Sequence, residues 1–105
     1  MTTDGAATRL VVLGAGPGGY PAAFLAAEMG MDVTLVDVEA NPGGVCLYRG
    51  CIPSKTLLHV AHVLDMAEQV TEFGVDFAEP SVDLDRLREG KDRVVAKMTS
   101  GLGQL

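Results

Sequence analysis

The chain has 105 residues, of which 48% are apolar and 21% are charged, and its formal net charge is −6. This length suits one domain and not two, and this composition argues against an intrinsically disordered chain. The acidic balance without a basic stripe argues against nucleic acid as a partner. Two cysteines are too few for a secreted disulfide scaffold, so close cysteines here indicate redox or metal chemistry.

A strand, a glycine-rich turn, a helix and a second strand are predicted in the first third of the chain. The β-branched run RLVVL at residues 9–13 is typical of a strand buried in a parallel sheet. Glycine-rich residues 14–19 form the turn, and the Ala-rich residues 20–29 favour a helix. Residues 32–36, DVTLV, read as the second strand. The order β-turn-α-β indicates an α/β fold with a right-handed crossover.

The apolar run over residues 10–27 is not predicted to be a membrane span or a signal peptide. Glycines and prolines would break a spanning helix at its start, and residues 1–8 form a short polar leader without a basic region. We therefore expect no targeting segment, no membrane partner and a cytoplasmic location.

The remaining residues predict a loop and two helices. Residues 41–50 carry turn chemistry and are expected to be a loop. A helix is expected from Pro53 to about Phe73, followed by a short extended piece at residues 75–77. Ser81 or Asp83 can cap a final helix. The apolar stripe of that helix is Leu84, Leu87, Val94, Val95, Met98 and Leu102.

The turn after the first strand contains the pattern G-x-G-x-x-G. Gly14 makes the tight turn, Gly16 lets a pyrophosphate approach the backbone, and Gly19 lets helix and strand pack closely. Asp37 ends the second strand, where an acid can bind a ribose hydroxyl. The predicted dinucleotide contacts are Gly14, Gly16, Pro17, Gly18, Gly19 and Asp37. The pattern does not distinguish NAD from FAD, and a purely structural glycine turn with Asp37 as a solvated strand end stays open.

Cys46 and Cys51 are five residues apart, which allows a small disulfide loop. A regular helix rises about 7.5 Å over five residues, more than the approach of about 7 Å that a disulfide tolerates. The segment must therefore be irregular or wound more tightly, which Gly50 makes easy. The helix beginning near Pro53 should lower the pKa of the Cys51 thiol, and Lys55 adds positive charge one turn later.

Two other interpretations of the cysteines stay open. They could be two unrelated buried thiols, or they could ligate zinc together with His59 and His62. The zinc pattern C-x4-C-x7-H-x2-H departs from the usual ligand spacings. No metal is therefore expected.

Residues 43–55, GGVCLYRGCIPSK, resemble the redox-disulfide signature of the flavin-dependent pyridine nucleotide-disulfide oxidoreductases. The ending CIPSK is most similar to the dihydrolipoamide dehydrogenase branch, since the glutathione and mercuric reductases usually have Val where Ile52 stands. The resemblance extends over residues 9–102. Tyr48 and Arg49 depart from it, because they replace the commoner Asn-Val.

The resemblance implies that residues 1–105 are the front part of a Rossmann-like FAD-binding domain with an incomplete parallel sheet. A redox-disulfide helix and a second helix would follow the β-turn-α-β unit, and the rest of the FAD domain, the NAD domain and the dimerisation domain would be absent. FAD would bind at the glycine turn with Asp37 on its adenosine ribose. The backbones of Gly43 and Gly44 would line FAD, and Lys55 would lie near the reactive end of the flavin.

The resemblance also implies the chemistry. Cys51 would face the flavin and Cys46 would exchange with the substrate, so that electrons pass from dihydrolipoamide through the disulfide and FAD to NAD. The partners would be a lipoyl domain of a 2-oxo acid dehydrogenase complex and a second subunit in a homodimer. The alternatives are another flavin disulfide reductase, acting on mercuric ion or a low-molecular-weight disulfide, and a truncated product without enzymatic activity.

Overall fold

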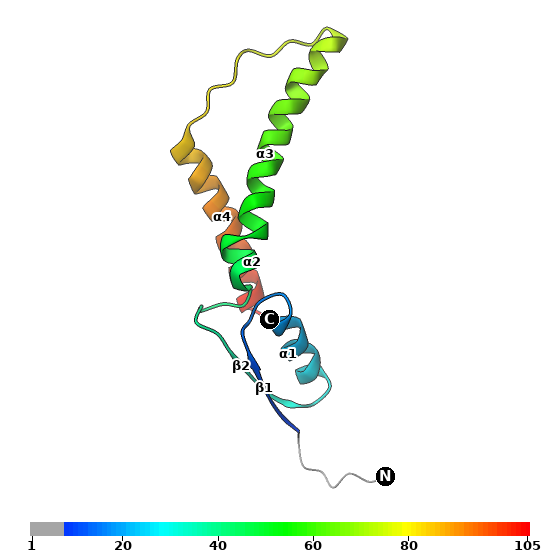
Figure 1. Cartoon of the computed structure of the whole chain (residues 1–105), viewed down its shortest axis with the longest axis vertical. Coiled ribbons are helices and arrows are strands. Elements are labelled where there is room, and N and C mark those ends of the chain that lie inside the picture. The colour runs from blue at the N-terminus through cyan, green and yellow to red at the C-terminus, as the bar shows by residue number, and fades with distance from the viewer. Residues whose placement is uncertain (1–7) are drawn as a thin grey trace.

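The computed structural model of the chain describes residues 8–105, and its first half is built on two parallel strands (Figure 1). Strand β1 (Arg9–Leu13) pairs with β2 (Asp32–Val36) in a register that runs from Arg9 opposite Asp32 to Leu13 opposite Val36. Helix α1 (Gly19–Glu28) connects the strands and packs on both of them. The predicted strand bounds and the α/β class with an incomplete parallel sheet are confirmed.

The second half is helical. Its elements in chain order are α2 (Gly44–Arg49), α3 (Cys51–Gln69), the 3₁₀ helix η1 (Val70–Phe73) and α4 (Leu84–Gly103). The prediction of a loop over residues 41–50 was wrong for the six residues of α2. A helix this short is unstable by itself, and α2 packs against both α3 and α4, which supplies the stability that its sequence lacks. The expected extended piece at residues 75–77 forms no strand.

Helices α3 and α4 form a long antiparallel arm (Figure 1). The helical segment formed by α3 and η1 ends at Gly74, whose φ of +78° is in the left-handed region that glycine adopts easily. Asp83 is the N-cap of α4, and its carboxylate accepts hydrogen bonds from the backbone N–H groups of Asp85 at 3.0 Å and Arg86 at 3.1 Å. Of the two predicted caps, Asp83 is therefore the one used.

Little side-chain surface is buried in this structure. The buried side chains among the described residues are Ala15, Ala23, Ala26, Leu47 and Thr99. The radius of gyration is 21.0 Å, against about 13 Å for a compact domain of this length. The apolar stripes of the arm are thus largely open.

Across residues 8–105, no helix combines the length and apolar character that a membrane span requires. The expectation that the polar leader carries no targeting segment concerns residues that lie, apart from Thr8, outside the described part of the chain.

Candidate functional site

The glycine turn between β1 and α1 is shaped by close backbone contacts. Gly14 has a φ of +95°, and its N–H donates to the carbonyl of Val36 at 2.7 Å. Gly16 accepts hydrogen bonds from the N–H groups of Gly19 at 3.0 Å and Tyr20 at 3.1 Å. A Cβ on Gly19 would collide with the carbonyl of Gly14. The turn therefore requires glycine at position 14 for its backbone conformation and at position 19 for its close packing.

Asp37 connects the end of β2 to this turn. Its Oδ2 accepts from the N–H of Ala15 at 2.7 Å, and its Oδ1 accepts from the N–H of Glu39 at 2.8 Å. These donors, Ala15 first, hold the pKa of the Asp37 carboxyl below its ordinary value of 3.8, against a smaller opposing effect of desolvation. A carboxylate has about four acceptor positions, so Asp37 keeps capacity for a ribose hydroxyl.

The glycine turn meets the loop that precedes α2. The N–H of Gly43 donates to the carbonyl of Ala15 at 2.7 Å. Gly44 has a φ of +65°, and a Cβ on it would lie 2.5 Å from the Cα of Gly16. Two glycine segments that are far apart in sequence therefore meet backbone to backbone and form one glycine-rich surface. A surface of this kind is what a dinucleotide needs for close approach to the backbone.

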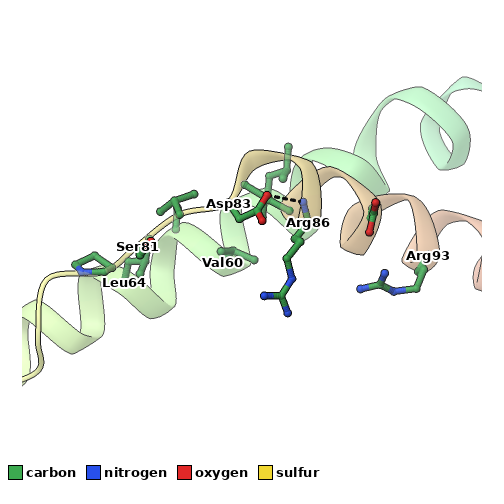
Figure 2. Close-up of a pocket in the computed structure, with 12 residues that line it drawn as sticks. Val60, Leu64, Ser81, Asp83, Arg86 and Arg93 are labelled. Carbon is green, nitrogen blue, oxygen red and sulfur yellow. Dashed lines mark hydrogen bonds between the residues drawn. The ribbon is translucent and has the colours of Figure 1, made fainter.

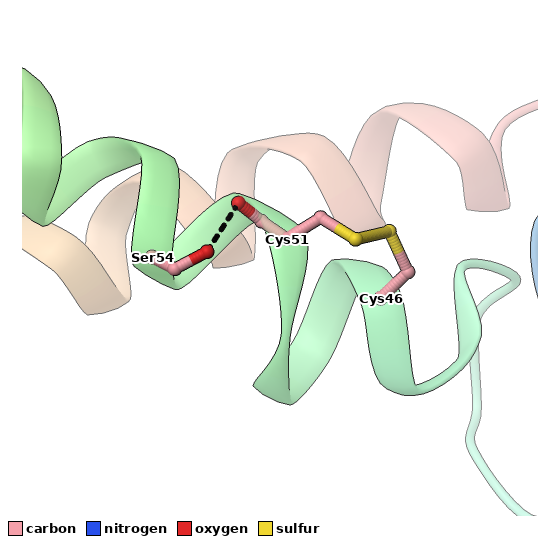
Figure 3. The surroundings of a disulfide bond; sticks show 3 residues. All are labelled: Cys46, Cys51 and Ser54. Carbon is pink, nitrogen blue, oxygen red and sulfur yellow. Dashed lines mark hydrogen bonds between the residues drawn. A yellow bond between two sulfur atoms is a disulfide. The ribbon is translucent and has the colours of Figure 1, made fainter.

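The structure joins Cys46 and Cys51 in a disulfide (Figure 3). Cys46 lies on α2, Cys51 is the first residue of α3, and Gly50 interrupts the two helices with φ −127° and ψ −102°. This interruption brings the two Cα atoms to 4.7 Å, which a continuous helix over five residues would not allow. The hydroxyl of Ser54 donates to the carbonyl of Cys51 at 3.1 Å in the first turn of α3.

The remaining predicted polar residues lie along α3. Lys55 is one helical turn after Cys51, and Lys55, His59 and His62 are all exposed. The zinc interpretation disagrees with the structure, because the two sulfur atoms are bonded to each other. Within residues 8–105, no group of three or more His, Cys, Asp and Glu side chains is placed to hold a metal ion.

A second set of contacts holds α2 against the loop after β2, and we call it the α2 brace: Glu39, Asn41, Tyr48 and Arg49. The guanidinium of Arg49 forms an ion pair with Glu39 at 2.5 Å and lies 5.9 Å from the centre of the Tyr48 ring. The Tyr48 hydroxyl donates to the carbonyl of Asn41 at 3.2 Å. In the sequence, Tyr48 and Arg49 were noticed only as departures from the family pattern, and no sequence pattern predicted their contacts with Asn41 and Glu39.

A groove of about 710 Å³ lies elsewhere, between α3, residues 80–83 and the start of α4 (Figure 2). Val60 and Leu64 come from α3, and Arg86 and Arg93 come from α4. None of the residues predicted for the dinucleotide or the disulfide lines this groove. The candidate site is therefore the glycine surface with the adjoining disulfide.

Comparisons with known proteins agree with this geometry. Residues 8–103 match the family described as pyridine nucleotide-disulphide oxidoreductase. The chain is 53% identical over 95 residues to the dihydrolipoyl dehydrogenase of Haemophilus influenzae and 50% identical over 94 residues to that of Vibrio cholerae. It is 50% identical over 98 residues to dihydrolipoyl dehydrogenase 3 of Haloarcula marismortui. These matches cover 90%, 90% and 93% of this chain, and the chain spans 20% of the length of each relative.

Proposed function

This chain belongs to the pyridine nucleotide-disulphide oxidoreductase family, and we propose that it forms the FAD-binding and redox-disulfide part of a dihydrolipoyl dehydrogenase. We propose residues 1–105 as the N-terminal part of the FAD domain. The observation that carries the proposal is the disulfide at the junction of α2 and α3, next to the backbone surface made by the two glycine segments.

The residues present fit FAD as the cofactor. Glycine at positions 19, 43 and 44 allows close packing that a Cβ would prevent, and at Gly14 and Gly16 no side chain covers the backbone. We propose that this surface, with Pro17 and Gly18, binds the pyrophosphate of FAD. Asp37 would accept a hydrogen bond from the adenosine ribose, and Lys55 would lie near the flavin. Bound there, FAD supplies an acceptor for the two electrons of the reduced disulfide.

The cysteines would carry the exchange with the dithiol substrate. A substrate thiolate attacks Sγ of Cys46, which breaks the bond between Cys46 and Cys51 and releases Cys51 as a thiolate. The N-terminus of α3 would stabilise that thiolate, because the helix dipole favours negative charge there. The second substrate thiol then attacks the mixed disulfide, so that the substrate leaves as a cyclic disulfide and Cys46 as a thiol.

The names of the relatives support dihydrolipoamide as this substrate. We propose a lipoyl domain of a 2-oxo acid dehydrogenase complex as its carrier, NAD as the final electron acceptor and a homodimer as the assembled form. We also propose a cytoplasmic location, because a disulfide that works by being reduced suits a compartment with reducing thiols.

The chemistry is tested by mixing the oxidised chain with dihydrolipoamide, alkylating the thiols and measuring the mass. We expect two alkylated cysteines in the wild type and one lipoamide adduct on Cys46 when Cys51→Ser is treated with lipoamide. Cys46→Ser is the matched variant, and it should form at least about tenfold less adduct. Equal adducts in the two variants would contradict the proposed role of Cys46.

Cofactor binding is tested separately by equilibrating the chain with FAD, followed by gel filtration and a visible absorption spectrum. Flavin bands that elute with the chain are expected, and a featureless protein peak would overturn the proposal that these residues bind FAD. Mercuric ion and a low-molecular-weight disulfide, tested against lipoamide in an NADH oxidation assay of the flavin-loaded protein, separate this function from the other reductases.

A further inference from the structure

We infer that the α2 brace positions Cys46 for reaction with Cys51 and thereby sets how readily their disulfide is reduced. The inference rests on the proposed function in one respect, which is that this disulfide opens and closes in the reaction. Tyr48 and Arg49 are positioning residues, because they act through α2 on the sulfur of Cys46.

Helix α2 needs external support to keep its place. It has six residues, and a helix of this length is not stable by itself in water. At its N-terminal end, the N–H of Gly43 is bonded to the carbonyl of Ala15. At its C-terminal end, the chain passes into the interruption at Gly50, and the disulfide and the brace add to the packing of α2 against α3 and α4.

Opening the disulfide removes one of these supports, so that the brace and the packing of α2 then hold the helix in place in only a fraction of the molecules. Disulfide formation within a chain depends on the effective concentration of one thiol near the other. In the reduced chain, that concentration is set by the fraction of molecules in which α2 keeps Cys46 beside the start of α3. The brace raises this fraction, so it favours the disulfide.

The chemistry of the brace suits this role. Glu39 is the more enclosed partner of the ion pair, with 25% of its side chain exposed against 64% for Arg49. Partial burial reduces the screening of a charge pair by salt. The ring of Tyr48 lies beneath the same guanidinium, and its hydroxyl fixes the loop at Asn41. Two of these contacts connect the last turn of α2 to Glu39 and Asn41 in the loop, and the third joins Arg49 to Tyr48 within the helix.

The test measures the equilibrium between the disulfide of the 105-residue chain and dithiothreitol. Reduction takes two electrons and two protons from dithiothreitol, which becomes a cyclic disulfide while Cys46 and Cys51 become thiols. Alkylation after equilibration gives the ratio of the two forms. For Arg49→Gln we expect about a fivefold shift towards the dithiol, which is about 20 mV at about 30 mV per tenfold change. Tyr48→Phe should shift the ratio in the same direction by about twofold.

The matched control is Arg88→Gln. Arg88 forms an ion pair with Asp85 at 3.2 Å and its side chain is 67% exposed, close to the 64% of Arg49, but it lies near the start of α4 and outside the α2 brace. This variant should leave the ratio within about 1.5-fold of the wild type. Exchanging the charges in the double variant Glu39→Arg with Arg49→Glu should return the ratio at least halfway from the Arg49→Gln value to the wild-type value.

A merely structural role would not give this result. Contacts that are formed equally in the oxidised and the reduced chain stabilise both and leave their equilibrium unchanged. Equal ratios for Arg49→Gln and Arg88→Gln would overturn the inference, as would failure of the charge exchange to restore the ratio in a variant with wild-type helical circular dichroism. A wild-type chain that forms no Cys46–Cys51 disulfide would instead overturn the proposed function.

Discussion

The region around the glycine turn and the helical arm of α3 and α4 are each stabilised by a different kind of contact. Around the glycine turn, backbone atoms contact backbone atoms, as where Gly43 bonds Ala15 and where Gly16 lies against Gly44. Along the arm, residues of α3 and α4 line an open groove, and no residue of α3 is buried. The site is therefore specified by the positions where side chains are missing, whereas the arm is specified by the spacing of its apolar side chains.

This difference has a consequence for how substitutions act. Where backbones touch, one added methyl group collides with an atom that cannot rotate away, so the cost is large and local. Where half-exposed apolar side chains meet, removing several methyl groups exposes surface that is already partly in water. We expect sensitivity to be concentrated around the turn and tolerance along the arm.

The largest effect is expected at Gly19. Replacement by alanine places a Cβ against the carbonyl of Gly14, and we expect a loss of about 3 kcal/mol in the free energy of unfolding. The matched control is Gly18→Ala, one residue earlier, where a Cβ would meet nothing within 4 Å and φ is −88°. That variant should lose less than about 1 kcal/mol. Urea unfolding followed by circular dichroism measures the free energy of unfolding of both variants. Equal losses would contradict the view that close backbone contacts specify the turn.

A second prediction sets one buried leucine against one open leucine. Leu47 on α2 is 6% exposed and Leu64 on α3 is 41% exposed. We expect Leu47→Ala to cost about 2–4 kcal/mol and Leu64→Ala to cost less than about 1 kcal/mol. The same urea titration compares them. A larger loss at Leu64 than at Leu47 would mean that the arm, and not the region around the turn, carries the stability of the chain.

The elements that could be predicted are those whose signals are local. The strands Arg9–Leu13 and Asp32–Val36 are β-branched apolar runs bounded by glycine or acid, and the structure has them at the predicted bounds. The interruption at Gly50 also follows from a local argument, since two cysteines five residues apart on one helix are too distant to bond. Glycine and covalent geometry act at short range, and a single sequence displays both.

The features that could not be predicted depend on partners far along the chain. Helix α2 was missed because its glycine-rich surroundings favour a loop, whereas packing on α3 and α4 makes it helical. The bond from Ala15 to Asp37 spans 22 residues, and a backbone N–H carries no sequence signature of its partner. The pairing of Arg49 with Glu39 is similar, because any of the 14 acidic residues of the chain could have been its partner.

The smallest effect, and the finest test of the turn, is the pH dependence of Asp37. Hydrogen bonds from Ala15 and Glu39 lower the pKa of its carboxyl in the folded chain, so the unfolded chain binds its proton more readily. The contribution of Asp37 to stability is therefore fully present above the ordinary value of 3.8 and is lost as the pH falls through the lower folded pKa. Asp37→Asn carries no such proton, and its amide oxygen keeps one acceptor for Ala15.

The urea midpoints of the wild type and Asp37→Asn should accordingly differ most near pH 7, and the difference should shrink as the pH falls below the ordinary value of 3.8. The other carboxyl groups are common to both proteins, so their titration cancels in the difference. Asp32→Asn, at the opposite end of β2, removes the same charge away from the turn and serves as the matched control. A gap between wild type and Asp37→Asn that stays constant from pH 7 to pH 3 would mean that Asp37 holds the turn by its shape and not by its charge.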